Sequence, residues 1–138
     1  MSKISVVRIE PESTLPIRQR VLWPHYPANF SRVEGDENAH HFGAYVDDQL
    51  VSVASVFSDN ETTVRLRKFA TLHDFQGQGI GSAMLTHIFD EMRADGISVL
   101  WCDGREAAHK FYERLGFKAS GDRFFKKEVA YFRMTKTL

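Results

Sequence analysis

Residues 74–84, DFQGQGIGSAM, place glycines at positions 77, 79 and 81, immediately before a segment with helical spacing. Glycine loses more conformational entropy on folding than other residues, so its repeated use indicates that another group must approach this backbone. The exposed N–H groups would lie at a helix N-terminus, where free donors and the helix dipole favour anions. The stretch therefore predicts a pyrophosphate site. The alternative is a tight strand-to-helix turn without a ligand.

Two familiar phosphate-binding loops do not fit this spacing. A Walker A loop would require glycine and lysine where the chain has Ser82 and Ala83. A dinucleotide-binding GxGxxG motif that began at Gly77 would also require a glycine in place of Ser82. Both loops are therefore excluded.

The segments on either side of the glycines predict a β-α-β unit. Residues 63–72 form the first strand, and residues 97–102, ISVLWC, are nearly all apolar, as in a strand covered on both faces. A helix between them should end near Gly96. Its apolar stripe consists of Ile80, Met84, Leu85, Ile88, Phe89 and Met92.

The N-terminal half predicts a strand, a helix and a hairpin. The helix is expected to be capped by Ser13 or Thr14, and the polar, aperiodic residues 24–40 predict a loop. Alternating apolar residues then predict a hairpin with strands at 42–46 and 50–57.

The C-terminal part predicts a helix and two closing strands. Asp103 and Glu106 have the spacing of a capping box, so a helix is expected over residues 105–115. Aromatic, alternating segments around residues 121–122 and at 131–134 suit two strands. The predicted fold class is α/β, with a mixed, mostly antiparallel sheet and flanking helices.

Composition narrows the class of protein. A chain of 138 residues with 43% hydrophobic and 26% charged residues is expected to form one soluble domain over residues 1–138. Eighteen basic residues balance eighteen acidic ones, which argues against nucleic-acid or membrane partners. The single cysteine, Cys102, and the absence of metal-ligand spacing favour a cytoplasmic protein without a metal.

Two motifs together resemble the GNAT superfamily of N-acetyltransferases. Residues 76–81, QGQGIG, match the family signature Q/R-x-x-G-x-G/A, and residues 111–117, FYERLGF, are similar to its FYEKLGF segment. The motifs stand in the family's order, separated by a helix and an apolar strand. The resemblance is close over residues 64–116 and weaker at both ends.

The resemblance implies a cosubstrate, acetyl-CoA, and a set of residues that bind it. In the family, two parallel strands splay apart, here 63–72 and 97–102, and the pantetheine arm pairs with the first. An N–H group near the end of that strand would polarise the thioester carbonyl, and Tyr112 would protonate the leaving thiolate. The residues that the resemblance assigns to cofactor binding are Phe69, Ala70, Thr71, Gln76, Gly77, Gln78, Gly79, Ile80, Gly81, Ser82, Asp103, Phe111 and Tyr112. Asp103 stands where relatives often carry asparagine, and a capping role explains it equally well.

The general base is left open by the sequence. Relatives that use a glutamate on the first splayed strand have it where this chain carries basic residues. His41 and Glu128 are the candidates, with a water-mediated route or an already neutral amine as the competing account. Arg65 and Arg67 share one side of their strand and either hold a substrate anion or pair with local acids.

The predicted function is transfer of the acetyl group of acetyl-CoA to a primary amine of a small-molecule acceptor, through a ternary complex. Aromatic residues in the early loop, among them Trp23, Tyr26 and Phe30, are candidates for the acceptor pocket. The alternatives are a non-catalytic acyl-CoA-binding domain and a peptide or protein N-acetyltransferase. Strand edges near the C-terminus are compatible with a homodimer.

Overall fold

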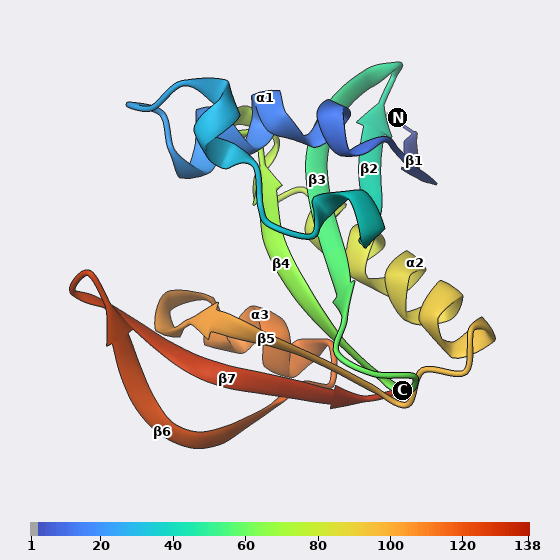
Figure 1. Cartoon of the computed structure of the whole chain (residues 1–138), viewed down its shortest axis with the longest axis vertical. Helices are drawn as coiled ribbons and strands as arrows, with labels where there is room; N and C mark the ends of the chain where they lie inside the picture. The colour runs from blue at the N-terminus through green and yellow to red at the C-terminus, as the bar shows by residue number, and fades with distance from the viewer. Residues whose placement is uncertain (1–2) are drawn as a thin grey trace.

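Seven strands form one sheet in the computed structural model, which describes residues 3–138 (Figure 1). The strands are β1 (Ile4–Arg8), β2 (His40–Val46), β3 (Gln49–Ser58), β4 (Thr63–Thr71), β5 (Val99–Arg105), β6 (Lys118–Lys126) and β7 (Val129–Thr137). Their order across the sheet is β1-β2-β3-β4-β5-β7-β6. Only the central pair, β4 and β5, is parallel, which confirms the predicted mixed sheet.

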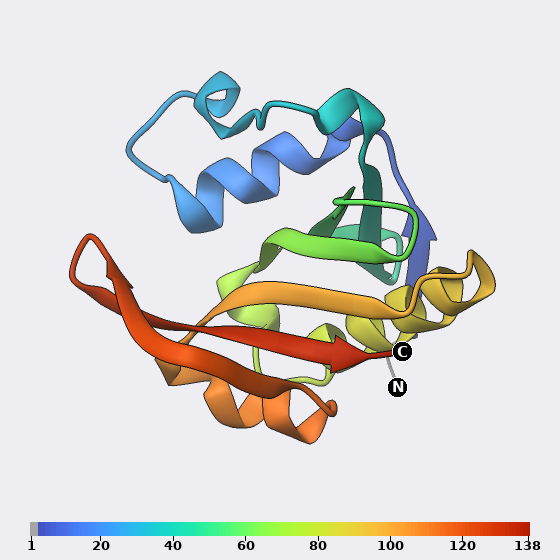
Figure 2. The same ribbon diagram turned by 60° about the horizontal axis from the view of Figure 1, so that its bottom comes forward.

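Helices cover both faces of the sheet, as Figure 2 shows. They are α1 (Pro11–Leu22), α2 (Ile80–Ala94) and α3 (His109–Arg114), with short 3-10 turns at Ala28–Ser31, Asp36–Asn38, His73–Phe75 and Glu106–Ala108. The main core lies between the sheet and the α2 and α3 side. A smaller core, in which Ile17 packs with Val53 and Ala70, lies under α1. Within residues 3–138, no helix has the length and apolar character needed to cross a membrane.

Helix α2 confirms the stripe predicted after the glycines. Its apolar residues at 80, 84, 85, 88, 89 and 92 are all buried, because a 3.6-residue repeat turns them toward the sheet. Burial of a side chain of this size contributes roughly 1.5 to 3 kcal/mol relative to exposure. The helix is therefore a rigid support for the loop that precedes it.

A β-bulge interrupts β4 and decides which residues face which side. Val53 of β3 pairs with Ala70 and Ser55 pairs with Arg67, so two residues of β4 stand opposite one of β3. Lys68, at the bulge, has a left-handed φ of 54°. Because of the extra residue, Arg67 faces the α1 side while Phe69 packs into the core on the α2 side.

The predicted start of α1 was wrong. The helix begins at Pro11 instead of after Ser13 or Thr14, because proline lacks only an N–H that the first turn leaves free. Thr14 is buried within the helix, and its hydroxyl donates to the carbonyl of Pro11 at 2.6 Å.

The predicted capping box was also wrong. Asp103 lies inside β5, which extends to Arg105, and α3 begins only at His109 with no side-chain cap. Glu106 belongs to the 3-10 turn between them. The Asp103 carboxylate accepts hydrogen bonds from side chains across the sheet instead.

Tight turns close the two hairpins. Asp47 and Asp48 connect β2 to β3, and Lys127 and Glu128 connect β6 to β7, each pair with positive φ. Two consecutive left-handed residues match the twist of the flanking strands. The predicted hairpin and the two closing strands are confirmed.

Candidate active site

The parallel strands β4 and β5 pair only at their first residues and then diverge. Residues 63–65 pair with residues 99–101, and within residues 3–138 no pairing between these strands extends further. Figure 1 shows the two strands separating toward their carboxyl ends. An open strand edge inside a sheet offers main-chain hydrogen bonds to an extended ligand.

The loop between β4 and α2 presents its main chain to solvent. Gly77 and Gly79 have φ of +73° and +82°, and a Cβ at either would meet no atom within 4 Å. These glycines are therefore required by the backbone conformation and not by packing. Within the described chain, the N–H groups of residues 77–82 have no acceptor. They remain available to an anion at the N-terminus of α2.

Gly81 has a different role from the other two glycines. A Cβ there would lie 3.2 Å from Cζ of Phe69 and 3.3 Å from Cζ of Phe111. The two rings lie 6.2 Å apart, centroid to centroid. Gly81 therefore lets the first turn of α2 approach β4 and α3 closely.

The residues predicted to bind the cosubstrate come from four segments, and contacts join Phe69 of β4, Gly81 of α2 and Phe111 of α3, whereas the Asp103 carboxylate contacts Arg65 and Lys126. Three of them are the last residues of β4 (Phe69, Ala70, Thr71), and seven lie in the loop and first turn of α2 (Gln76 to Ser82). The other three are Asp103 in β5 and Phe111 and Tyr112 in α3. The side chains of Gln76 and Gln78 brace the loop by donating to the carbonyls of Thr71 (3.0 Å) and Asp74 (2.9 Å). These glutamines are thus turned back onto the loop, which leaves its main chain as the exposed donor surface.

Tyr112 packs against β5. A Cβ at Gly104 would lie 2.9 Å from the Tyr112 ring, so glycine is needed there. Burial raises the pKa of Tyr112, and the neighbouring Cys102 raises it further. Burial also raises the pKa of Cys102 to about 12. Both groups are protonated at neutral pH, so Tyr112 is a proton or hydrogen-bond donor and Cys102 is not a nucleophilic thiolate.

Asp103 joins the two splayed strands to the C-terminal hairpin. Its Oδ2 accepts hydrogen bonds from Arg65 Nη2 and Lys126 Nζ, both at 3.0 Å. The guanidinium of Arg65 also lies 4.6 Å from the ring centroid of Trp101. Arg65 therefore pairs with a local acid, whereas Arg67 forms no ion pair with any residue from 3 to 138.

The two candidate bases lie in very different surroundings. His41 is 2% exposed, and its Nε2 lies 2.7 Å from the carbonyl of Asp36, to which it must donate. Its Nδ1 lies 2.7 Å from the hydroxyl of Ser55, with which it shares a hydrogen bond. This geometry leaves His41 no free nitrogen for an acceptor amine. Glu128 is exposed in the turn between β6 and β7.

The sequence analysis missed a buried ionic network that contains His41. Arg18 is fully buried and donates to both carboxylate oxygens of Asp36, at 2.8 and 3.0 Å, and to Ser55 at 2.8 Å. It also donates to the carbonyl of Ser31 at 3.0 Å. Burial by itself would raise the pKa of Asp36, but the hydrogen bonds from Arg18 and from the Val33 N–H hold it below its usual value. The network fixes the loop at residues 31–36 to α1 and to the sheet.

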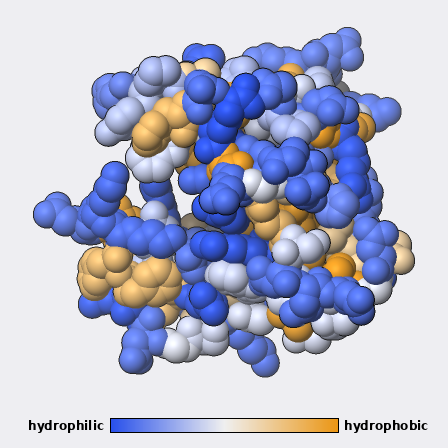
Figure 3. Space-filling view, viewed as in Figure 1, coloured by the Kyte–Doolittle hydropathy of each residue, from blue (hydrophilic) through white to orange (hydrophobic). Residues whose placement is uncertain are grey.

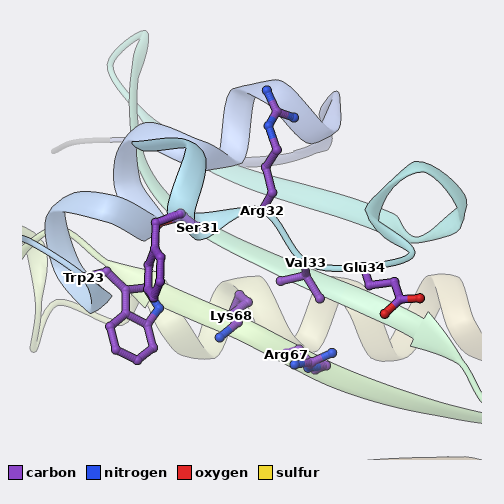
Figure 4. Close-up of a pocket in the computed structure, with 8 residues that line it drawn as sticks. Trp23, Ser31, Arg32, Val33, Glu34, Arg67 and Lys68 are labelled. Atoms are coloured by element: carbon purple, nitrogen blue, oxygen red, sulfur yellow. The ribbon is translucent and has the colours of Figure 1, made fainter. Parts of the chain in front are cut away.

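A pocket of about 400 Å³ opens beside this loop on the α1 side of β4 (Figure 4). It is lined by Trp23, Phe30, Ser31, Arg32, Val33, Glu34, Arg67 and Lys68. Trp23 and Phe30, which were candidates for an acceptor pocket, are in its wall. Figure 3 shows the same face hollowed between the α1 end and the projecting β6–β7 hairpin, with hydrophilic residues around the hollow.

Comparison with known proteins identifies the family. The sequence pattern of the acetyltransferase (GNAT) domain matches residues 20–138. The chain is 30% identical over 129 residues to an uncharacterized N-acetyltransferase, YitI, of Bacillus subtilis, covering 88% of this chain and 87% of that protein. The chain therefore belongs to the GNAT family of acetyltransferases, and it is an acyltransferase.

Other similarities are shorter or confined to the fold. The chain is 45% identical over 47 residues to the [ribosomal protein bS18]-alanine N-acetyltransferase of Escherichia coli, which is 32% of each chain. A putative N-acetyltransferase from Lactobacillus plantarum has the same fold, with a TM-score of 0.86, 17% identity and 98% coverage of both chains. A GNAT acetyltransferase from Elizabethkingia anophelis with acetyl-CoA bound has a TM-score of 0.77, 14% identity and 98% coverage of both chains.

Proposed function

We propose that this protein transfers the acetyl group of acetyl-CoA directly to a primary amine of a small-molecule acceptor, in one domain formed by residues 1–138. The observation that carries the proposal is the run of unsatisfied N–H groups at residues 77–82 beside the open edge of β4. An anionic, extended ligand fits both features at once, because the first binds phosphate and the second binds an amide-containing arm. Acetyl-CoA supplies an activated acyl group when it is bound.

The main chain of β4 would orient the reacting carbonyl. Phe69, Ala70 and Thr71 lie between the bulge and the glycine loop, where β5 no longer covers the strand edge. An N–H group aimed at the developing negative charge stabilises the transition state, and the loss of one such donor commonly costs a factor of about 10² to 10³. Because this donor belongs to the backbone, ordinary side-chain substitution would not remove it.

Tyr112 would donate to the departing sulfur. Its raised pKa keeps the phenol protonated over the working range of an enzyme. A neutral donor held against Gly104 by packing can meet a thiolate as it forms, without an ordering cost at that moment. We assign to the Tyr112 hydroxyl a hydrogen bond to the departing sulfur and then donation of the proton; its raised pKa keeps it protonated but makes it a weaker acid than the thiol that forms.

The acceptor would enter from the α1 side and lose its proton without a general base from the protein. His41 offers no free nitrogen, and Glu128 lies in an exposed turn. Amine that reaches the site in its neutral form, or a water-mediated route, needs neither side chain. Substitution of Glu128 by glutamine is therefore expected to leave turnover within a factor of about two, since exposed surface changes usually have small effects.

Release of free thiol from acetyl-CoA tests this function. With purified protein, thiol should appear only when an amine is supplied, and the amine should gain one acetyl group by mass spectrometry. Tight binding of coenzyme A without amine-dependent thiol release from any member of a broad amine panel would contradict the proposal. The panel includes peptides with a free N-terminal alanine, because of the short match to an enzyme named for that acceptor. Turnover confined to those peptides would replace the small-molecule acceptor by a peptide.

The cellular setting is a separate part of the proposal. Cys102 is a free, buried thiol, which fits a reducing compartment such as the cytoplasm. We also propose that the protein forms a homodimer, because β6 is an edge strand of the sheet.

A further inference from the structure

Two basic side chains share the floor of the pocket on the α1 side. Arg67 and Lys68 are consecutive in β4 and would point to opposite faces of a regular strand. The bulge at Lys68, with its left-handed φ of 54°, places both in the lining of one pocket. Figure 4 shows the two side chains next to each other, between Trp23 and Glu34. A strained backbone conformation at a non-glycine residue is typical of functional sites.

Neither cation has an ion-pair partner in the part of the chain that the structure describes. Among residues 3–138, no carboxylate lies within ion-pair distance of Arg67 or Lys68. Arg32 pairs with Glu12, and its guanidinium points away from the pocket in Figure 4. Glu34 lines the pocket but forms no ion pair with either cation.

The charges that surround Lys68 are themselves positive. Both side chains are half-buried. Desolvation and then the charges of Arg67, Arg18, Lys126 and Arg65 lower the pKa of Lys68. Crowding of like charges in a half-buried place costs free energy that an oxyanion would recover.

A buried hydroxyl, an indole ring and a third cation also lie at this pocket. The hydroxyl of Ser31, which is 2% exposed, lines the pocket and has no hydrogen-bond partner in the described chain. Trp23 forms the apolar wall, with the ammonium groups of Lys68 and Lys127 lying 5.6 and 5.3 Å from its ring centroid. Lys127 comes from the β6–β7 turn, so the hairpin adds a third cation at this wall.

We propose that the pocket binds an oxyanion group of the acceptor, a carboxylate or a phosphate, through Arg67 and Lys68, so that the preferred acceptors are amines that carry an acid. This inference rests on the acetyl transfer proposed above and narrows its substrate class. Because of the bulge, Arg67 and Ala70 stand opposite Ser55 and Val53, which are two residues apart on β3 and so about 6 to 7 Å apart along the strand. A small molecule can therefore place its acid on Arg67 and Lys68 while its amine reaches the acyl group held near Phe69 and Thr71.

Matched amines test the inference. Initial rates of thiol release are measured for γ-aminobutyrate against its amide, and for phosphoethanolamine against ethanolamine, which separates carboxylate from phosphate. We expect kcat/KM to be at least about tenfold higher for the acid in one or both pairs, the size of a charge-assisted hydrogen bond. Equal rates within both pairs, with turnover present, would overturn the inference and leave the proposed function intact. Absence of turnover with every amine would instead remove the proposed function and this inference with it.

Variants assign the preference to the two cations. Arg67→Met and Lys68→Met should each lower the acid-to-neutral ratio several-fold, and the double variant should bring it close to one. Arg67→Lys should retain part of the preference because it keeps the charge. Arg93→Gln, a change at an exposed arginine on α2, is the control and should leave the ratio unchanged. Calorimetric titration with coenzyme A checks that each variant is folded, and an unchanged ratio in a double variant that binds coenzyme A normally would overturn the assignment.

Discussion

The two sides of the splayed strands present different chemical groups, main-chain groups on one side and side chains on the other. On the α2 side, the surface consists of main-chain N–H groups at residues 77–82 and the edge of β4, with side chains turned away or absent. On the α1 side, the pocket consists of side chains from α1, the loop at residues 28–34 and the bulge of β4. A backbone surface does not depend on the identity of side chains, whereas a side-chain surface changes with the residues that line it.

The two sides are also held in place by different parts of the fold. The glycine loop is carried by α2, whose apolar stripe is buried in the main core. The pocket on the α1 side is supported by the buried network around Arg18, which ties the loop at residues 31–36 to α1 and to β3. Damage to the network should therefore affect the pocket on the α1 side and spare coenzyme A binding.

The largest effect is expected at Tyr112. Tyr112→Phe keeps the ring against Gly104 but removes the donor, and kcat should fall by about 10² to 10³, within the usual contribution of a positioned acid. Coenzyme A affinity should be unchanged in calorimetry. Retention of more than a third of wild-type kcat would show that another group protonates the sulfur.

The next effect concerns the buried network. Arg18→Met leaves the Asp36 carboxylate buried without its partner, and the free energy of unfolding should fall by about 3 to 5 kcal/mol. Arg20→Met, two residues further along the exposed side of α1, is the matched control and should change stability by less than about 0.5 kcal/mol. Urea unfolding measures both. Equal losses would show that Arg18 contributes no more than a surface arginine.

A smaller effect is the acid sensitivity that Asp36 confers. Its pKa is lowered in the folded state, so its contribution is complete above the unfolded value of about 3.9 and is lost as pH falls through the folded pKa. Between pH 6 and pH 3, Asp36→Asn should therefore lose less stability than the wild type, while Asp90→Asn, at an exposed acid, should follow the wild type. Parallel curves for all three proteins would contradict this assignment.

The smallest effect is the backbone cost at the two ends of α2. Gly79 and Gly96 both have φ of +82°, and a Cβ at either meets no atom within 4 Å. Gly79→Ala and Gly96→Ala should thus lose similar stability, about 1 to 2 kcal/mol, because each forces alanine into the left-handed region. A much larger loss for one of them in thermal unfolding would reveal packing that the glycine geometry does not show.

The glycine loop and α2 could be predicted from the sequence because their signals are local. The glycine spacing, the stripe of α2 and the FYERLGF segment each lie within a few turns of chain and report a backbone requirement or a period. The boundaries were less predictable: β5 ends at Arg105, three residues beyond the expected end. The sequence around Asp103 resembles a helix cap. Its actual partners, Arg65 and Lys126, lie 38 and 23 residues away and reach it only in the folded chain.

The pocket on the α1 side could be predicted only in part: Trp23, Phe30 and Arg67 stand out in the sequence, but the contacts that hold the pocket together join distant segments. Arg18 meets Asp36 and Ser55 only in the folded chain. One signal was present: Arg18 lies three residues after Leu15 and four before Leu22, in the middle of the apolar face of α1. A charged residue at such a position indicates a buried partner. The bulge at Lys68, which brings two cations into one pocket, has no comparable signal.

Titration of coenzyme A into the Gly79→Ala and Gly96→Ala proteins tests most directly the claim that the main chain of the loop holds the cosubstrate. The two variants share the same backbone penalty, but only position 79 adds a methyl group next to the N–H groups of residues 77–82. We predict that Gly79→Ala weakens binding at least about tenfold, the loss of roughly one strong hydrogen bond, and that Gly96→Ala binds as the wild type does. Wild-type affinity in the Gly79→Ala protein would contradict the claim.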